Sequence, residues 1–277
     1  MTTTATATAT ATAAKTVLEV AGLHRSFGGV RAVDDVSFVL PEGGSLGIVG
    51  ESGSGKTTTA RIVVGLERAD TGRVLIHGRD RGEHRRGKAG RLERAREIQM
   101  VFQDPFLSLD PRTTVGGALR ETLKLHFPGT DHTRRITELL DQVGLGAREA
   151  DALPRQLSGG QRQRVAIARA LAVEPSVLVL DEAVAALDVS VQAQILNLLF
   201  DIREQTGIGY LFITHDLGVV RCVTDDVIVM RNGRIVEAGP TAQVLADPQH
   251  PYTRLLLESV PRPGWDPRGI AAARRAL

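Results

Sequence analysis

The sequence predicts an α/β protein, in which buried strands alternate with helices along 277 residues. Two apolar runs, SVLVLDE and GYLFITHD, are typical of buried parallel strands. A third run, SLGIVG, leads into a glycine-rich loop and then into TTTARIVVGL, which has helical spacing. The hydrophobic content of 42% is ample for a buried core. These three observations together favour an α/β core.

The N-terminal third predicts a different kind of sheet. From Thr16, the segments VLEVAGL and AVDDVSFVL are β-rich, and the turn at 41–44 follows them. We expect these segments to form antiparallel strands, with a further strand at VLIHG. Ahead of them, residues 1–15 form a Thr/Ala-rich tail, which we expect to be disordered because its composition is of low complexity. This tail lacks the charged start and apolar stretch of a secretory signal.

The middle of the chain predicts helices. Residues from about Thr113 to Arg169 have mostly helical patterns, so we predict a helical subdomain over about 104–170. The arginine-rich stretch 79–98 is interrupted by acidic residues, and we interpret it as a solvated helix and loop instead of a nucleic-acid contact. No internal repeat is visible, so we predict that the chain contains one copy of the α/β domain and not two.

Charge and cysteine content restrict the classes of partner. Lys and Arg number 34 against 32 Asp and Glu, which leaves +2 and does not indicate a nucleic-acid or anionic-lipid partner. The single cysteine, Cys222, cannot form an internal disulfide, and its apolar neighbours predict a buried thiol. No apolar run reaches the roughly 18 residues that a membrane-spanning helix needs.

The loop after SLGIVG has the pattern of a phosphate-binding loop. Backbone N–H groups in such a loop wrap phosphate oxygens at a helix N-terminus. We expect Lys56 to reach the β- and γ-phosphates of ATP, and the Thr57 hydroxyl to bind Mg²⁺. The residues that we expect to bind the nucleotide here are Gly50, Glu51, Ser52, Gly53, Ser54, Gly55, Lys56, Thr57 and Thr58.

Two acidic residues end the apolar strand VLVLDE. We expect Asp181 to belong to the magnesium shell and Glu182 to polarise the water that attacks the γ-phosphate. The alternative for Asp181 is a carboxylate that only caps a helix or lies in a loop.

The segment Leu157-Ser158-Gly159-Gly160-Gln161 precedes a long helical pattern and lies between the two nucleotide motifs. It resembles the signature motif of ABC ATPases. This resemblance implies a P-loop NTPase (RecA-like) core with an antiparallel β subdomain and an α-helical signature subdomain. It also implies that the signature residues serve the γ-phosphate held by the opposite subunit, so that the site is complete only in a closed dimer.

Further family elements follow in order. Gln103 in VFQDP resembles the Q-loop glutamine, which implies a role in sensing magnesium and water. His215 in ITHD resembles the switch histidine that contacts the γ-phosphate, and Asp188 in AALD resembles the D-loop residue that acts across the dimer. Phe27 lies where the family places an aromatic ring over adenine, and a core phenylalanine is the alternative.

The C-terminal stretch narrows the resemblance. His250-Pro251-Tyr252-Thr253, followed by a leucine-rich helix, resembles the tail of oligopeptide and dipeptide importer ATPases. The resemblance covers 16–263 as one ABC ATPase domain, with this tail at about 240–263 and a short extension at 264–277. It implies two transmembrane permease subunits, a second identical or similar ATPase subunit, and indirect action with an extracellular solute-binding protein. The implied place is the cytoplasmic face of the cell membrane.

The sequence departs from the family between Glu182 and Asp188. The family usually has Pro-Thr-Ser where this chain has Ala183-Val184-Ala185. Loss of the proline frees the backbone, and loss of two hydroxyls removes hydrogen-bonding groups, so hydrolysis or coupling between subunits could be weakened.

Two other functions compete with import. Close relatives include accessory ATPases of soluble phosphonate-degrading complexes, and the motifs do not separate these from importers. DNA-repair and chromosome ATPases of the superfamily carry long coiled coils between the phosphate loop and the signature, and no heptad insertion fits between Lys56 and Leu157. We therefore expect no nucleic-acid partner.

Overall fold

The computed structural model describes residues 15–83, 87–104 and 109–260. The predicted tail at 1–15 lies outside these ranges except for Lys15. The predicted extension at 264–277 and the last three residues of the predicted 240–263 region also lie outside them.

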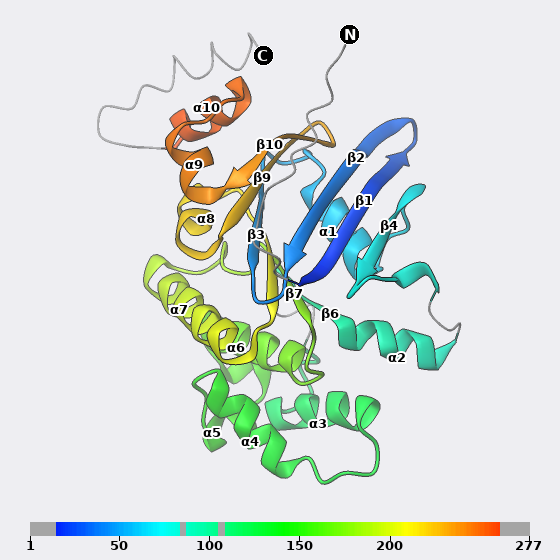
Figure 1. Cartoon of the computed structure of the whole chain (residues 1–277). Helices are drawn as coiled ribbons and strands as arrows, with labels where there is room; N and C mark the ends of the chain where they lie inside the picture. The colour runs from blue at the N-terminus through cyan, green and yellow to red at the C-terminus, as the bar shows by residue number, and fades with distance from the viewer. Residues whose placement is uncertain (1–14, 84–86, 105–108, 261–277) are drawn as a thin grey trace.

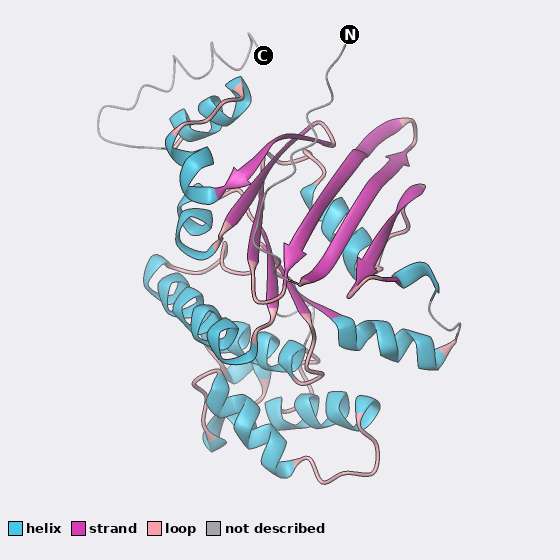
Figure 2. Cartoon of the chain, viewed as in Figure 1, coloured by secondary structure: helices cyan, strands magenta, loops and turns pink. Residues whose placement is uncertain are grey.

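A six-stranded sheet forms the core of the protein (Figures 1 and 2). Its strands are β3 (Ser45–Val49), β6 (Ile98–Val101), β7 (Val177–Asp181), β8 (Gly209–Ile213), β9 (Asp226–Arg231) and β10 (Arg234–Pro240). They lie in the order β10-β9-β3-β8-β7-β6, and only β10 pairs antiparallel to its neighbour. The apolar runs predicted as buried strands became β7 and β8, which confirms the α/β class. Because the other strands are parallel, the loops that follow β3, β6, β7 and β8 start at the same edge of the sheet.

A four-stranded antiparallel sheet lies beside this core, as the alternating N-terminal segments predict (Figure 2). Its strands are β1 (Thr16–Phe27), β2 (Val30–Pro41), β4 (Thr71–Ile76) and β5 (Arg79–Asp80). Leu18 and Leu40 of this sheet share one apolar cluster with Ile48 of β3. Helix α1 (Lys56–Val64) contributes Val63 to the same cluster, so the two sheets and the helix share one core.

The remaining helices form two groups. Helices α3 to α6 gather at one end of the molecule, below the sheets in Figure 1, as predicted for the helical segment. Their bounds are α3 (Val115–His126), α4 (Thr133–Gln142), α5 (Ala147–Ala150) and α6 (Gly159–Leu171). The others are α2 (Lys88–Glu97), α7 (Val189–Thr206), α8 (Leu217–Val223), α9 (Thr241–Ala246) and α10 (Pro251–Glu258). The described residues also include the short 3₁₀ turns η1 (Arg81–Glu83) and η3 (Pro154–Gln156). The described part of the chain contains no helix that is long and apolar enough to cross a membrane.

The prediction of a buried thiol is wrong, because Cys222 is exposed. Helix α8 turns Val219 and Val220 toward the core. Cys222 lies in the last turn of this seven-residue helix, beside the exposed Arg221. The burial of Val219 and Val220 therefore does not extend to Cys222.

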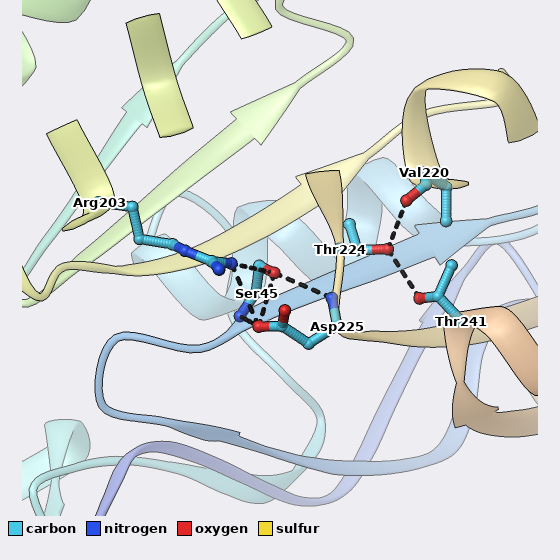
Figure 3. A network of polar contacts seen from close by, with 6 residues as sticks. All are labelled: Ser45, Arg203, Val220, Thr224, Asp225 and Thr241. Carbon is cyan, nitrogen blue, oxygen red and sulfur yellow. Dashed lines mark hydrogen bonds and ion pairs between the residues drawn. The ribbon is translucent and has the colours of Figure 1, made fainter. Parts of the chain in front are cut away.

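A polar network joins three elements at the edge of the sheet where β3 and β9 begin (Figure 3). The backbone N–H and the hydroxyl of Ser45 both donate to Asp225 Oδ2 at 2.9 Å. Arg203 of α7 donates to the same oxygen at 3.1 Å and to the Ser45 hydroxyl. Next to them, the Thr224 hydroxyl lies 2.9 Å from the Val220 carbonyl and 2.9 Å from the Thr241 hydroxyl. The network ties the end of α7 to the beginnings of two central strands.

We expect Asp225→Ala to lower the free energy of unfolding by about 1–2 kcal/mol, because it removes the acceptor of three hydrogen bonds, one of them from a charged donor. The Asp225 side chain is half exposed, so the loss is smaller than for a buried ion pair. Urea unfolding measures the difference. Glu204→Ala, which removes an exposed carboxylate from the same helix, is the control and should cost less than about 0.5 kcal/mol. Equal effects of the two changes would contradict the stabilising role of the network.

Candidate nucleotide-binding site

The predicted phosphate-binding loop lies between β3 and α1 and borders a cleft of about 1260 Å³. Glu182 follows β7 and His215 lies two residues beyond the end of β8, so both come from the same edge of the sheet as the loop. The cleft is lined by Ala32, Val49, Gly50, Glu51, Ser52, Gly53, Gly55, Lys56, Thr57, Thr58, Glu182, His215, Asp216, Leu217, Leu256, Ser259 and Val260. Ser54 is buried beneath the loop. The structure therefore brings the loop together with two of the three predicted catalytic residues.

The loop is packed tightly against neighbouring strands at Gly55. This residue has φ +103° and lies just before α1. A Cβ atom there would lie 2.3 Å from the Ala32 carbonyl oxygen of β2. Only glycine combines this backbone conformation with this approach. The position of the loop is therefore set by β2 as well as by β3.

Lys56, the first residue of α1, contacts the loop that precedes it. Its side chain is buried, and Nζ donates to the Gly50 carbonyl at 2.7 Å and to the Glu51 carbonyl at 2.8 Å. Burial lowers the pKa of Lys56, and the negative charges of Glu182, Asp181 and Glu51 oppose that shift. A cation held by the loop at the N-terminus of α1 suits the binding of a polyphosphate.

Asp181 and Thr57 could hold a divalent cation. Burial and the nearby charge of Glu182 raise the pKa of Asp181, while Arg61, Lys56 and a hydrogen bond with Thr57 act against the shift. One carboxylate oxygen of Asp181, Oδ1, is buried without a hydrogen-bond partner in the described structure. Within the described ranges, no group of three or more His, Cys, Asp or Glu side chains is placed to hold a metal. Magnesium usually binds through one or two protein groups plus substrate phosphates, so this pair fits Mg²⁺ held with a nucleotide.

We expect Asp181→Asn to remove most of the dependence of nucleotide binding on Mg²⁺. The amide lacks the negative charge that attracts the cation, and the loop that contacts the phosphates is unchanged. The affinity for ATP should be measured with Mg²⁺ and with EDTA, and the ratio of the two should fall toward about 1. Asp201→Asn, an exposed change on α7, should keep the ratio of the unmodified chain. A normal ratio for Asp181→Asn would exclude this residue from the metal site.

Glu182 and His215 form a pair at the mouth of the cleft. His215 Nδ1 lies 3.0 Å from Glu182 Oε1, and the backbone N–H of Glu182 donates to the Ile213 carbonyl at 2.8 Å. Glu182 has φ +48°, a conformation that costs a non-glycine residue of order 1–3 kcal/mol and often occurs at functional sites. The Glu182 carboxylate thus contacts His215 at the border of the cleft.

The segment Ala183-Val184-Ala185, which differs from the usual Pro-Thr-Ser of the family, packs partly into the core. Ala183 and Val184 are both buried in the apolar cluster of the helical end. The N–H of Ala185 donates to the Glu182 carbonyl at 3.0 Å, and the N–H of Leu187 donates to the Val184 carbonyl at 3.2 Å. The segment is thus a pair of turns without the family's proline, held by backbone hydrogen bonds and apolar contacts.

The signature residues lie away from the cleft, at the N-terminus of α6. Ser158 caps the helix: its hydroxyl accepts from the N–H of Gln161 at 3.2 Å, and Gln161 Oε1 accepts from the N–H of Ser158 at 2.9 Å. Gly159 and Gly160 follow in the first turn, and a Cβ at Gly160 would lie 2.5 Å from Val191 Cγ1 of α7. The first N–H groups of α6 remain outside the cleft of their own chain.

Four other predicted residues also lie outside the cleft lining: Asp181, which ends β7 next to Glu182, Asp188, Gln103 and Phe27. Asp188 caps α7, accepting from the Val191 N–H at 2.9 Å and from the Ser190 hydroxyl at 2.7 Å. Gln103 is exposed two residues beyond β6, at the same edge of the sheet as Asp181. Phe27 is 44% exposed, with the Arg25 guanidinium 4.5 Å from the ring centre. The alternative that Phe27 is a core residue is therefore wrong.

The cleft also includes residues in and just after α10 that the sequence did not predict as part of the site. Leu256, Ser259 and Val260 line it, and the Tyr252 hydroxyl accepts a hydrogen bond from the N–H of Glu51 at 3.0 Å. The helical spacing of these residues after His250-Pro251 was a signal of a buried helix face. Nothing in the local pattern indicated that this face meets the phosphate loop.

The sequence matches two family models and several transport ATP-binding proteins, in agreement with a nucleotide-binding cleft. The family model "ABC transporter" matches residues 33–185, and the model "Oligopeptide/dipeptide transporter, C-terminal region" matches residues 236–276. The chain is 49% identical over 234 residues to the glutathione import ATP-binding protein GsiA of Escherichia coli, covering 84% of this chain and 37% of GsiA. It is 44% identical over 257 residues to the oligopeptide transport ATP-binding protein OppF of Bacillus subtilis, covering 90% of this chain and 84% of OppF.

The fold has a close counterpart among solved structures. The ATP-binding cassette MJ0796, in a dimeric post-hydrolysis structure bound to ADP and Pi, has a TM-score of 0.70 and 30% identity, over 81% of this chain and 98% of MJ0796. The chain spans little more than a third of GsiA but most of OppF. Because the first family model matches more than half of the chain and the motifs lie on the same fold, the chain belongs to the ABC transporter family.

Proposed function

We propose that this chain is the ATP-binding and ATP-hydrolysing subunit of an importer for peptides or peptide-like solutes. The observation that carries the proposal is a cleft that holds the phosphate-binding loop, Glu182 and His215 but none of the signature residues of the same chain. Such a site needs a second ATPase subunit to supply the missing helix N-terminus. The dimeric state of MJ0796 supports this requirement, and the names of GsiA and OppF support import.

In the proposed dimer, each cleft receives the α6 N-terminus of the other subunit. Ser158 and Gly160 would place N–H and hydroxyl groups on the γ-phosphate, where the partial positive charge of the helix end favours an anion. Asp188 would act across the same interface, and Phe27 would stack on adenine. A helix N-terminus and the buried Lys56 would thus face the phosphates from opposite sides.

Hydrolysis would depend on the pair at the mouth of the cleft. Glu182 would orient the attacking water and accept its proton, while His215 would hold the carboxylate and contact the γ-phosphate. Gln103 would contact the magnesium ion and the attacking water, and would link the nucleotide site to the helical subdomain. When bound between Thr57 and Asp181, Mg²⁺ would neutralise charge on the β- and γ-phosphates.

The proposal extends to organisation and partners. Residues 16–263 would form one ATPase domain, with the signature subdomain at about 104–170. Two transmembrane permease subunits would dock on the chain at the cytoplasmic face of the membrane, and a solute-binding protein outside the cell would act on the same permeases. The match of the peptide-transporter model to 236–276 supports this assignment.

An affinity pull-down of the tagged chain from detergent-solubilised native membranes, with mass spectrometry of the partners, tests the proposal. Recovery of two multi-span permeases is the expected result, and a second ATPase would identify a mixed pair. Recovery of soluble enzymes alone would reject import and favour an accessory ATPase of a soluble complex. An MgATP hydrolysis assay on the same preparation tests the enzymatic part separately.

A further inference from the structure

The helix α10 and the two residues after it form one wall of the nucleotide cleft. Tyr252, Leu256, Ser259 and Val260 are spaced by four, three and one residues, which puts them on one face of a helix. We call this set the inner face of α10. Its last three members line the cleft, and its first member contacts the phosphate loop. In Figure 1, α10 lies at the end of the molecule where β9 and β10 meet α9.

Tyr252 is held rigidly beneath the loop. Its side chain is 2% exposed and belongs to an apolar cluster with Val49 and Leu217, which border the cleft. The Arg231 guanidinium lies 4.9 Å from the centre of its ring. With the ring fixed in this way, the hydroxyl has a defined place, where it accepts the hydrogen bond from Glu51.

The first turn of α10 is anchored to β10. His250 Nδ1 accepts from the N–H of Tyr252 at 3.1 Å, and Pro251 occupies the first helical position, where its missing N–H costs nothing. Glu237 of β10 accepts from the N–H groups of Gln249 at 2.7 Å and His250 at 3.1 Å. These contacts fix where α10 begins and how its first turn lies against β10. Tyr252, in this first turn, is thereby held next to the phosphate-binding loop.

The contact matters because of what Lys56 does in the loop. The Lys56 ammonium group donates hydrogen bonds to the carbonyls of Gly50 and Glu51. When a nucleotide binds, the N–H donors of this ammonium group are needed for phosphate oxygens, so the loop loses hydrogen bonds from Lys56. Two contacts from outside the loop do not involve Lys56: the Tyr252 hydroxyl accepts from the N–H of Glu51, and the Ser54 carbonyl accepts from the N–H of Gly233 at 3.0 Å.

We propose that Tyr252 is a positioning residue of the nucleotide site, through which the C-terminal helix keeps the phosphate-binding loop in its binding shape. This inference rests on the proposed ATPase function of the cleft. Tyr252 acts through Glu51 and does not touch the reacting atoms. Since the loop contacts phosphates in the ground state and the transition state alike, its effect falls on binding and not on the chemical step.

The test compares the two tyrosines of the chain. Tyr252→Phe keeps the ring and removes the hydroxyl, and we expect the KM for MgATP to rise about three- to tenfold with kcat within about twofold of normal. Tyr210→Phe is the matched control, because Tyr210 is equally buried and its hydroxyl has no hydrogen-bond partner in the described structure. Its KM should equal that of the unmodified chain.

A second readout does not depend on hydrolysis. Hydrogen exchange of a peptide covering residues 47–56, measured without nucleotide, should be faster in Tyr252→Phe and unchanged in Tyr210→Phe, because the Glu51 amide loses its acceptor. Glu237→Ala loosens the start of α10 without touching the cleft, and it should raise KM in the same direction by a smaller factor.

The outcomes separate this inference from the proposed function. A normal KM and normal exchange in Tyr252→Phe would overturn the positioning role, and so would a fall in kcat at normal KM. If the unmodified chain fails to bind or hydrolyse ATP, the proposed function fails. The exchange experiment would then still decide whether Tyr252 restrains the loop.

Discussion

Glu182→Gln is expected to lower kcat for ATP hydrolysis by about 10²- to 10⁴-fold, the usual contribution of a positioned general base. The amide keeps the size of the carboxylate and can still contact His215, which lies 3.0 Å from it. It cannot accept a proton from water. ATP binding should persist, so that the variant accumulates as an ATP-bound dimer.

Phosphate release at saturating MgATP measures the loss, and size-exclusion chromatography with ATP detects the dimer. Glu204→Gln, the same change at an exposed position on α7, should behave as the unmodified chain. A Glu182→Gln variant that turns over at the normal rate would remove this residue from the chemical step.

Gly55→Ala is expected to damage both the fold and the site. The substitution puts a side chain on a residue with φ +103° and directs Cβ to within 2.3 Å of the Ala32 carbonyl oxygen. Because the opposing atom is backbone of β2, it cannot move aside cheaply. We expect the free energy of unfolding to fall by about 2–4 kcal/mol, and the affinity for MgATP to fall by about 10²-fold through displacement of the loop.

Gly53→Ala is the matched control for stability. Gly53 lies in the same loop with φ +80°, but a Cβ there meets nothing within 4 Å. Its unfolding free energy should fall only by the backbone strain, about 1–2 kcal/mol. Urea unfolding of the two variants without nucleotide makes the comparison, and equal losses would show that the approach of β2 does not constrain the loop.

Local patterns in the sequence predicted the elements of the fold and the positions of the motifs. The apolar runs that form β7 and β8 are recognisable because a strand buried on both faces needs consecutive apolar residues. The loop before α1 is recognisable because phosphate binding needs glycines at fixed positions. The expected roles of Glu182 and His215 at the γ-phosphate are consistent with their contact in the structure, where parallel strands end at one edge of the sheet.

Contacts between distant segments were beyond such patterns. Tyr252 and Glu51 are 201 residues apart, and only the path of the whole chain brings them together. The exposure of Cys222 and Phe27 likewise depends on which side of an element faces the core. The sequence shows the residue types and the neighbouring residues, but not which side of a helix or strand packs against the core.

Helix α7 joins two regions that have been described separately. Its first turn is capped by Asp188 and packs against the signature glycine Gly160 through Val191, and its last turn carries Arg203. An uninterrupted helix of 18 residues is about 27 Å long. One continuous element therefore connects the surroundings of the signature glycine to the anchor at Ser45 and Asp225, at the edge of the sheet where β3 and β9 begin.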